Sequence, residues 1–306
     1  MKNLVGGLAV AVLALGVGAQ GAAAQDWAKA NLVKSPRHGE FVTINEPGGR
    51  KLQAFVVYPE VKGKAPVVVM IHEIFGQSVW ALEMADELAG AGYIVVEPDL
   101  LSGFGPAPKA AAPAEPAAND ATMDHSHMQA PAGAGAAFVP AEPGGTAAFP
   151  DQTSVTKAVS TLDAGVVTAD LDAAADYGKK LPAANGKLFV AGFCWGGGKT
   201  FLFATHRRDL SGAMVFYGPP PPVEAMKNIN APVYGFYAGN DARITATIPD
   251  TQAAMKAAGK TYDPKIYEGA GHGFMRAGEA PDANVANTAA RTDGFKRLVD
   301  LLGGVR

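Results

Sequence analysis

Short, nearly continuous apolar runs alternate along the chain with segments in which apolar residues recur at helical spacing. Runs rich in β-branched residues, such as APVVVMI at 65–71, are typical of strands buried on both faces of a parallel sheet. Further strands are expected at 52–60, 93–100, 186–194, 212–218 and 231–241, and helices at 78–92, 167–182, 197–207, 248–260 and 287–304. This alternation predicts a single α/β domain with a mostly parallel central sheet and helices on both faces.

The first 24 residues have the pattern of a secretory signal peptide. Lys2 precedes an apolar run that ends in small residues, and cleavage is expected after Ala24. The apolar run is shorter than the roughly 20 residues that a membrane span needs, so we expect no stable membrane insertion. Residues 25–306 would then form the mature domain, exported to the periplasm or secreted.

The alternation is interrupted between Phe104 and Pro150, where 29 of 47 residues are Ala, Pro or Gly. Such a composition buries too little apolar surface to offset its chain entropy, so we expect a disordered excursion at about 104–150. Within it, His125 and His127 are flanked by methionines and are weak candidates for binding copper or another soft metal. A solvated loop with incidental histidines is the simpler interpretation, because two histidines without a fixed scaffold bind metals weakly.

The charge balance and the cysteine count narrow the function classes. A formal net charge of −3 provides no basic surface for nucleic acid. The sequence has no phosphate-binding or dinucleotide-binding glycine motif, so no nucleotide cofactor is expected. The single cysteine, Cys194, excludes an intramolecular disulfide. In an oxidising compartment such a thiol is either hidden or retained for its chemistry.

The stretch GFCWG places Cys194 between a predicted strand and a predicted helix, with Gly192 and Gly196 two residues to either side. This is the nucleophile-elbow pattern G-x-S-x-G with cysteine in place of serine. Small residues at the flanking positions let the backbone pass close to its neighbours. The helix N-terminus would stabilise a thiolate and a developing oxyanion. The pattern therefore predicts a catalytic cysteine rather than a buried structural one.

A nucleophile of this kind needs a base, and the base needs an acid that orients it. In this arrangement the chain order is nucleophile, acid, histidine. Asp241 follows the strand predicted at 231–241, and His272 lies in the glycine-rich loop EGAGHGF, so both stand in the expected order. Asp250 and Asp263 are possible substitutes for Asp241, although the first opens a helix and the second precedes a proline.

The stretches IHEIFG, GFCWGGG, GNDARIT and GAGHGFMR, in this order, resemble the dienelactone hydrolase (carboxymethylenebutenolidase) family. The resemblance extends from about Phe41 to the C-terminus, apart from the excursion, and it implies the α/β-hydrolase fold. It also implies that Cys194 is the nucleophile, His272 the base and acid, and Asp241 the residue that orients His272.

The resemblance implies roles for four further residues. Glu73 matches a glutamate that lies beside the resting thiol and helps to deprotonate it when substrate arrives. The backbone N–H groups of Trp195 and Ile74 would form the oxyanion hole. Arg276 matches an arginine that binds a substrate carboxylate, for which its planar fork is suited. A second carboxylate-binding arginine of the family has no counterpart in the stretch DLLSGFG.

These features predict an exported hydrolase of small esters or enol-lactones, acting through a thioester acyl-enzyme. The missing arginine and the predicted export leave the dienelactone substrate itself open, and a carboxylate-bearing substrate is one option. The alternatives are a broad-specificity carboxylesterase and a non-catalytic metal-binding protein on a hydrolase scaffold. We expect a monomer with a small-molecule substrate, no cofactor and no nucleic acid partner.

Overall fold

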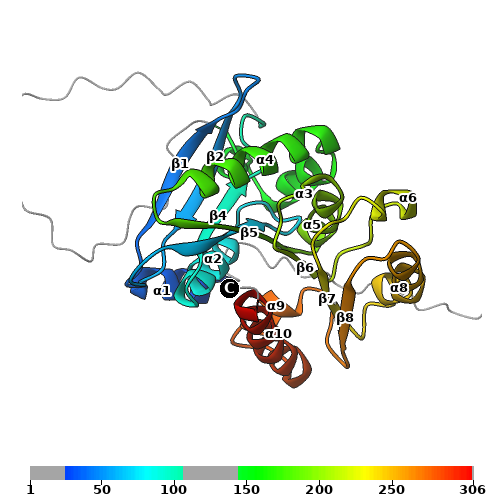
Figure 1. The fold of residues 1–306 in the computed structure, drawn as a ribbon. Helices are drawn as coiled ribbons and strands as arrows, with labels where there is room; N and C mark the ends of the chain where they lie inside the picture. Colours follow the sequence, from blue (N-terminus) through cyan, green and yellow to red (C-terminus); the bar gives the residue numbers. More distant parts are fainter. Residues whose placement is uncertain (1–24, 106–143, 305–306) are drawn as a thin grey trace, which may run out of the picture.

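The computed structural model describes residues 25–105 and 144–304. Within these ranges eight strands form one sheet in the order β1-β2-β4-β3-β5-β6-β7-β8 (Figure 1). The β1–β2 and β2–β4 pairs are antiparallel, and all pairs from β4 to β8 are parallel, so the predicted mostly parallel sheet is confirmed. The strands are β1 (Gly39–Asn45), β2 (Lys51–Val57), β3 (Ala65–Ile71), β4 (Ile94–Asp99), β5 (Ala184–Phe193), β6 (Gly212–Phe216), β7 (Val233–Ala238) and β8 (Tyr262–Tyr267).

Helices cover both faces of the sheet, as the alternation of elements predicts (Figure 1). One face packs against α4, α5, α6 and α8, and the other against α1, α2, α9 and α10. The helices are α1 (Asp26–Lys34), α2 (Val79–Gly90), α3 (Gln152–Ser160), α4 (Ala164–Lys180), α5 (Trp195–His206), α6 (Val223–Met226), α7 (Ala242–Thr245), α8 (Ile248–Ala257), α9 (Phe274–Ala277) and α10 (Val285–Gly304), with one 3-10 helix, η2 (Thr146–Ala148).

Strand β3 shows why the apolar runs are continuous. All seven of its residues are buried. Val67 and Val69 belong to the core under α4 and α5, whereas Val68 and Met70 belong to the core under α2 and α10. Because successive side chains of a strand point to opposite faces, a strand covered on both sides needs apolar residues at every position. None of the helices in the described residues is long and apolar enough to cross a membrane.

The excursion predicted at about 104–150 needs a correction at its C-terminal end. Residues 144–150 are part of the described fold and include η2. The Thr146 N–H donates to Asp99 Oδ2 at 2.6 Å, and its hydroxyl donates to Asp99 Oδ1 at 2.9 Å. Composition does not predict this attachment to Asp99, because it depends on the hydrogen bonds of one residue, Thr146. The signal peptide predicted at 1–24 and the segment with His125 and His127 lie outside the described residues.

The turn from β5 into α5 holds Cys194 in a backbone conformation that L-residues rarely adopt, with φ 56° and ψ −116°. Glycines make this turn possible. A Cβ on Gly192 would lie 2.4 Å from the Gly196 carbonyl oxygen, and a Cβ on Gly196 would lie 2.4 Å from the carbonyl oxygens of Ile71 and His72. The close approach of backbone to backbone therefore excludes any side chain at either flank.

We predict that Gly196→Ala lowers the free energy of unfolding by about 1–3 kcal/mol, because rigid backbone atoms must move to admit the new methyl group. Gly303→Ala is the control, since no atom lies within 4 Å of a Cβ built there. Urea denaturation of the two variants and the wild type measures the difference. Equal stability of both variants would show that the elbow has room for a side chain.

Candidate active site

Three side chains that the sequence predicts as a catalytic triad lie in line at the carboxyl edge of the sheet. Cys194 follows β5, Asp241 follows β7, and His272 lies in the loop between β8 and α9. His272 Nε2 is 3.0 Å from Cys194 Sγ, and His272 Nδ1 is 2.5 Å from Asp241 Oδ2. Carboxyl ends of parallel strands converge at one edge, which brings together residues that are up to 78 positions apart in the chain.

Neither alternative to Asp241 lies in the triad. The side chain of Asp263 is 61% exposed and accepts a hydrogen bond from Arg297. Asp250 lies in the first turn of α8 and is exposed. Asp241 is only 8% exposed and is the acid that meets His272.

The resting sulfur is a protonated thiol. Burial and the negative charge of Glu73 raise the pKa of Cys194 to about 11, although the N–H groups of Trp195 and Ile74 and the charge of Arg243 lower it. The helix N-terminus, which the sequence predicts to favour a thiolate, is therefore outweighed. At a pKa of about 11, only about one thiol in ten thousand is ionised at pH 7. A nucleophilic role requires a group that removes the proton when substrate is present.

Glu73 lies beside this thiol as a buried, paired carboxylate. It is 3% exposed, and its Oε2 accepts a hydrogen bond from Arg276 Nε at 2.8 Å. Tyr217 donates its hydroxyl to Glu73 Oε1 at 3.4 Å. The guanidinium of Arg276 also lies over the Phe75 ring, 4.9 Å from its centroid. Glu73 and Arg276, to which the family resemblance gives separate roles, thus form one ion pair next to the sulfur.

The backbone N–H groups of Ile74 and Trp195 both hydrogen-bond to the sulfur and lower the pKa of Cys194. Trp195 opens α5, whereas Ile74 belongs to the loop after β3. Two backbone donors next to a nucleophile are the arrangement that holds an oxyanion during acyl transfer.

The loop with Ile74 is held from several sides. His72 is fully buried, its Nδ1 is 2.7 Å from the Glu73 carbonyl oxygen, and burial lowers the pKa of this imidazole. Gln77 donates its side-chain N–H to Glu97 Oε2 at 2.7 Å, and its backbone N–H to the Thr146 hydroxyl at 2.9 Å. Residue Thr146 therefore helps to fix the loop that carries the Ile74 N–H group.

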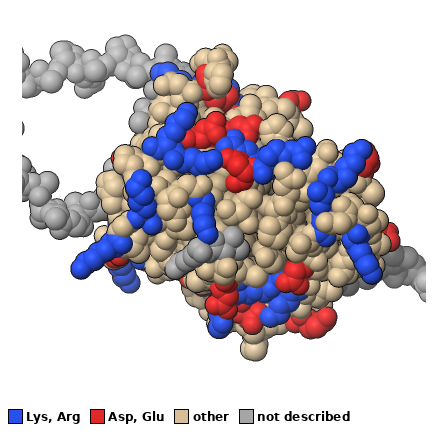
Figure 2. All heavy atoms as spheres, viewed as in Figure 1, with Lys and Arg blue, Asp and Glu red and all other residues tan. Residues whose placement is uncertain are grey.

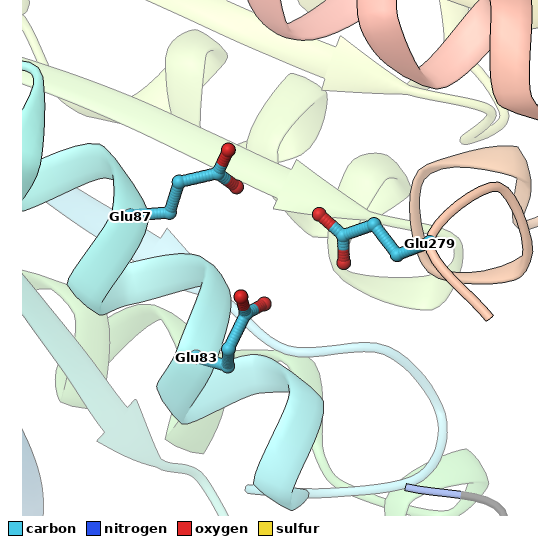
Figure 3. A group of neighbouring side chains, drawn as sticks. All are labelled: Glu83, Glu87 and Glu279. Atoms are coloured by element: carbon cyan, nitrogen blue, oxygen red, sulfur yellow. The ribbon is translucent and has the colours of Figure 1, made fainter. Parts of the chain in front are cut away.

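Three carboxylates away from the triad lie close enough together to be considered as a metal site. Figure 3 shows Glu83 and Glu87 of α2 and Glu279 after α9, with their carboxylates pointing toward one another. Arg291 of α10 already bonds Glu87 and Glu279, and Trp80 Nε1 donates to Glu279 Oε2 at 2.8 Å. Burial and neighbouring carboxylates raise the pKa of Glu83 to about 7. Because Arg291 bonds both Glu87 and Glu279, the group acts as an ion network that joins α2 to α10.

A family model described as the dienelactone hydrolase family matches residues 52–305. The chain belongs to the dienelactone hydrolase family. The family resemblance noted in the sequence is thereby confirmed, and the protein is an enzyme of the hydrolase class.

Individual relatives of the dienelactone hydrolase family agree with this assignment. A Saccharolobus solfataricus protein named "Putative carboxymethylenebutenolidase" is 31% identical over 270 residues, covering 83% of this chain and 94% of the relative. The "Carboxymethylenebutenolidase" of Pseudomonas putida is 27% identical over 271 residues, covering 86% and 95%. A crystal structure titled "Putative Dienelactone Hydrolase" from Klebsiella pneumoniae has a TM-score of 0.67 at 24% identity, covering 87% of this chain and 98% of that chain. This structural likeness supports the α/β-hydrolase fold.

Sequence reasoning missed three residues around the site. Tyr217 has a strained backbone, with φ 38°, and packs edge-on against the His272 ring at 5.1 Å. Its only signal in the sequence is its place directly after β6. Composition places Thr146 in the predicted excursion, and Arg243 lies in the stretch GNDARIT, where the sequence predicts a role for Asp241 alone. None of the three belongs to a residue pattern that identifies it.

We predict that Glu73→Gln lowers the pKa of Cys194, because a nearby negative charge that disfavours the thiolate is removed. At pH 8 the variant should therefore react with neutral iodoacetamide several-fold faster than the wild type, while its ester hydrolysis falls. Cys194 is the only cysteine, so mass spectrometry reports its alkylation directly. The control is Glu224→Gln on α6, an exposed site. An unchanged or slower alkylation of Glu73→Gln would contradict the electrostatic account.

Proposed function

We propose that this member of the dienelactone hydrolase family hydrolyses small carboxylic esters or enol-lactones through a Cys194–His272–Asp241 triad. The observation that supports it is the continuous line from sulfur through imidazole to carboxylate, at 3.0 Å and 2.5 Å. Backbone donors of Ile74 and Trp195 lie next to the same sulfur. Nucleophile, base, orienting acid and oxyanion donors are the parts that acyl transfer needs.

In the first step the thiol proton of Cys194 passes to Glu73, and the sulfur attacks the ester carbonyl carbon. The carbonyl oxygen becomes an oxyanion between the N–H groups of Ile74 and Trp195. Collapse of this intermediate breaks the bond to the alkoxide or enolate oxygen, which takes up the proton that Glu73 received from the thiol. The product is a thioester on Cys194, and in a lactone the leaving oxygen stays attached to the acyl group.

In the second step water attacks the thioester carbon while His272 Nε2 accepts its proton. The C–S bond then breaks, the carboxylate product leaves, and the thiol is restored. Asp241 holds the imidazole in the tautomer that accepts at Nε2. No metal or cofactor is required by these steps.

Glu73 is the group that we propose accepts the thiol proton at the start of the cycle. In the absence of substrate its carboxylate accepts hydrogen bonds from Arg276 and Tyr217. A substrate carboxylate that competes for Arg276 would leave a bare Glu73 oxygen next to a buried thiol. Proton transfer would then follow from substrate binding, which keeps the thiol unreactive while the site is empty.

Export of the enzyme is part of the proposal, and it rests on the signal-peptide pattern of residues 1–24. The substrate is expected to be a small molecule. Figure 2 shows acidic and basic side chains interspersed on the visible face, in line with the small net charge of −3.

Purified wild-type protein is expected to hydrolyse p-nitrophenyl acetate and cis- or trans-dienelactone, with Cys194→Ala losing at least about 10³-fold of this activity. Released p-nitrophenolate and the ultraviolet absorbance of dienelactone measure the two reactions. A preference for dienelactone indicates that Arg276 suffices for that substrate, whereas turnover of the simple ester alone indicates a broad carboxylesterase. Activity of Cys194→Ala equal to that of the wild type would refute the triad.

A further inference from the structure

The described residues contain a second guanidinium at the triad, contributed by Arg243. This residue lies in α7, two positions after Asp241. Its Nη2 is 3.9 Å from Asp241 Oδ2, the oxygen that meets His272 Nδ1 at 2.5 Å. A separation of 3.9 Å is too long for a hydrogen bond. Arg243 therefore lies near Asp241 but donates no hydrogen bond to it.

The exposure of Arg243 shows that its donors face solvent at the site. Its side chain is 68% exposed, compared with 8% for Asp241. Among residues 25–105 and 144–304, no hydrogen-bond acceptor contacts its guanidinium. Arg207, by contrast, is largely buried and forms ion pairs with three aspartates. An exposed planar fork beside a reacting group can bind a carboxylate through two parallel N–H···O bonds.

Arg276 and Arg243 belong to two different short helices near the triad. Arg276 is in α9 and is 25% exposed, and its Nε is bonded to the buried Glu73. Arg243 is in α7, and among the described residues its only ion pair is the 3.9 Å contact with Asp241, which is too long to be a hydrogen bond. The positive charge of Arg243 lowers the pKa of Cys194, so its field reaches the sulfur. The field at the thiol therefore includes the charge of Arg243, a guanidinium that is 68% exposed, whereas Arg276 is 25% exposed and hydrogen-bonded to Glu73.

We propose that Arg243 is a substrate-binding residue that recognises a negatively charged group, most simply a carboxylate, on the ester or lactone that reacts at Cys194. This inference rests on the proposed function and extends it, because it selects anionic esters as the preferred substrate class. Arg243 does this work next to the triad acid, independently of the Glu73–Arg276 ion pair.

The single cysteine allows a test that does not depend on turnover. Iodoacetate and iodoacetamide both alkylate the thiolate, forming a C–S bond and releasing iodide, but only iodoacetate carries a negative charge. Their rate ratio cancels any change in the fraction of thiolate. Arg243→Gln is expected to lower the iodoacetate to iodoacetamide ratio at Cys194 by about threefold or more at low salt. Arg243→Lys, which keeps the charge, should retain most of the ratio.

Arg208→Gln is the matched control. Arg208 is an exposed arginine between the end of α5 and the start of β6, at the opposite edge of the sheet from Cys194. The Arg208→Gln variant should have the same iodoacetate to iodoacetamide ratio as the wild type. A ratio in Arg243→Gln equal to that of the wild type overturns the proposal, as does an equal drop in Arg208→Gln, which would reveal only the global charge.

A second readout uses p-nitrophenyl hemisuccinate, whose acyl group ends in a carboxylate, beside neutral p-nitrophenyl acetate. The kcat/KM ratio of the anionic to the neutral ester should fall about tenfold in Arg243→Gln, as expected for loss of a charge-assisted hydrogen bond. An unchanged ratio means that Arg243 acts through the triad and overturns the proposal. If the wild type hydrolyses neither ester, the proposed function fails, and the alkylation ratio still decides the role of Arg243.

Discussion

The active site depends on the close packing of the α5 N-terminus against the carboxyl ends of β3 and β6. A Cβ on Gly196 would meet the Ile71 and His72 carbonyl oxygens, and a Cβ on Gly197 would meet the Phe216 carbonyl oxygen. This contact fixes where the helix starts and holds Cys194 at φ 56°. Strain of this kind persists only where the surrounding structure enforces it, and it is concentrated at functional sites. The position of the sulfur relative to His272 follows from this packing.

The second constraint is electrostatic. A thiol placed beside a buried carboxylate is held in its protonated form, and the same carboxylate is held by a guanidinium from α9. Low dielectric strengthens both effects. The arrangement makes the charge state of the sulfur depend on the partner of Glu73, and a protonated thiol is less prone to oxidation than a thiolate. Tyr217 and the buried His72 restrict how Glu73 and its loop can move.

Much of the fold could be predicted from hydrophobic periodicity, because strands covered on both faces leave uninterrupted apolar runs. Helix α1, helix α3 and strand β1 are not predicted. Each of the two helices buries only two residues and β1 is largely half-buried, so none of them shows a strong pattern. Thr146 was missed because the anchor is a set of hydrogen bonds to Asp99, which composition does not reveal. The meeting of Cys194, Asp241 and His272 could be predicted because strand ends and glycine-rich loops mark these residues. Glu73 and Arg276 are 203 positions apart in the chain, so only the tertiary structure shows that they pair. The contact of Arg243 with Asp241 is also visible only in the structure, because no sequence pattern indicates where the Arg243 side chain lies.

The central claim is that Cys194 carries the acyl group during turnover. The most direct measurement is to quench the wild-type protein in acid during hydrolysis of p-nitrophenyl acetate and to locate acetyl groups by peptide mass spectrometry. The account predicts one acetyl group on the Cys194 peptide, released by neutral hydroxylamine as expected for a thioester. Sustained hydrolysis with no acetyl group on Cys194, or with acetyl on another residue, would contradict the account.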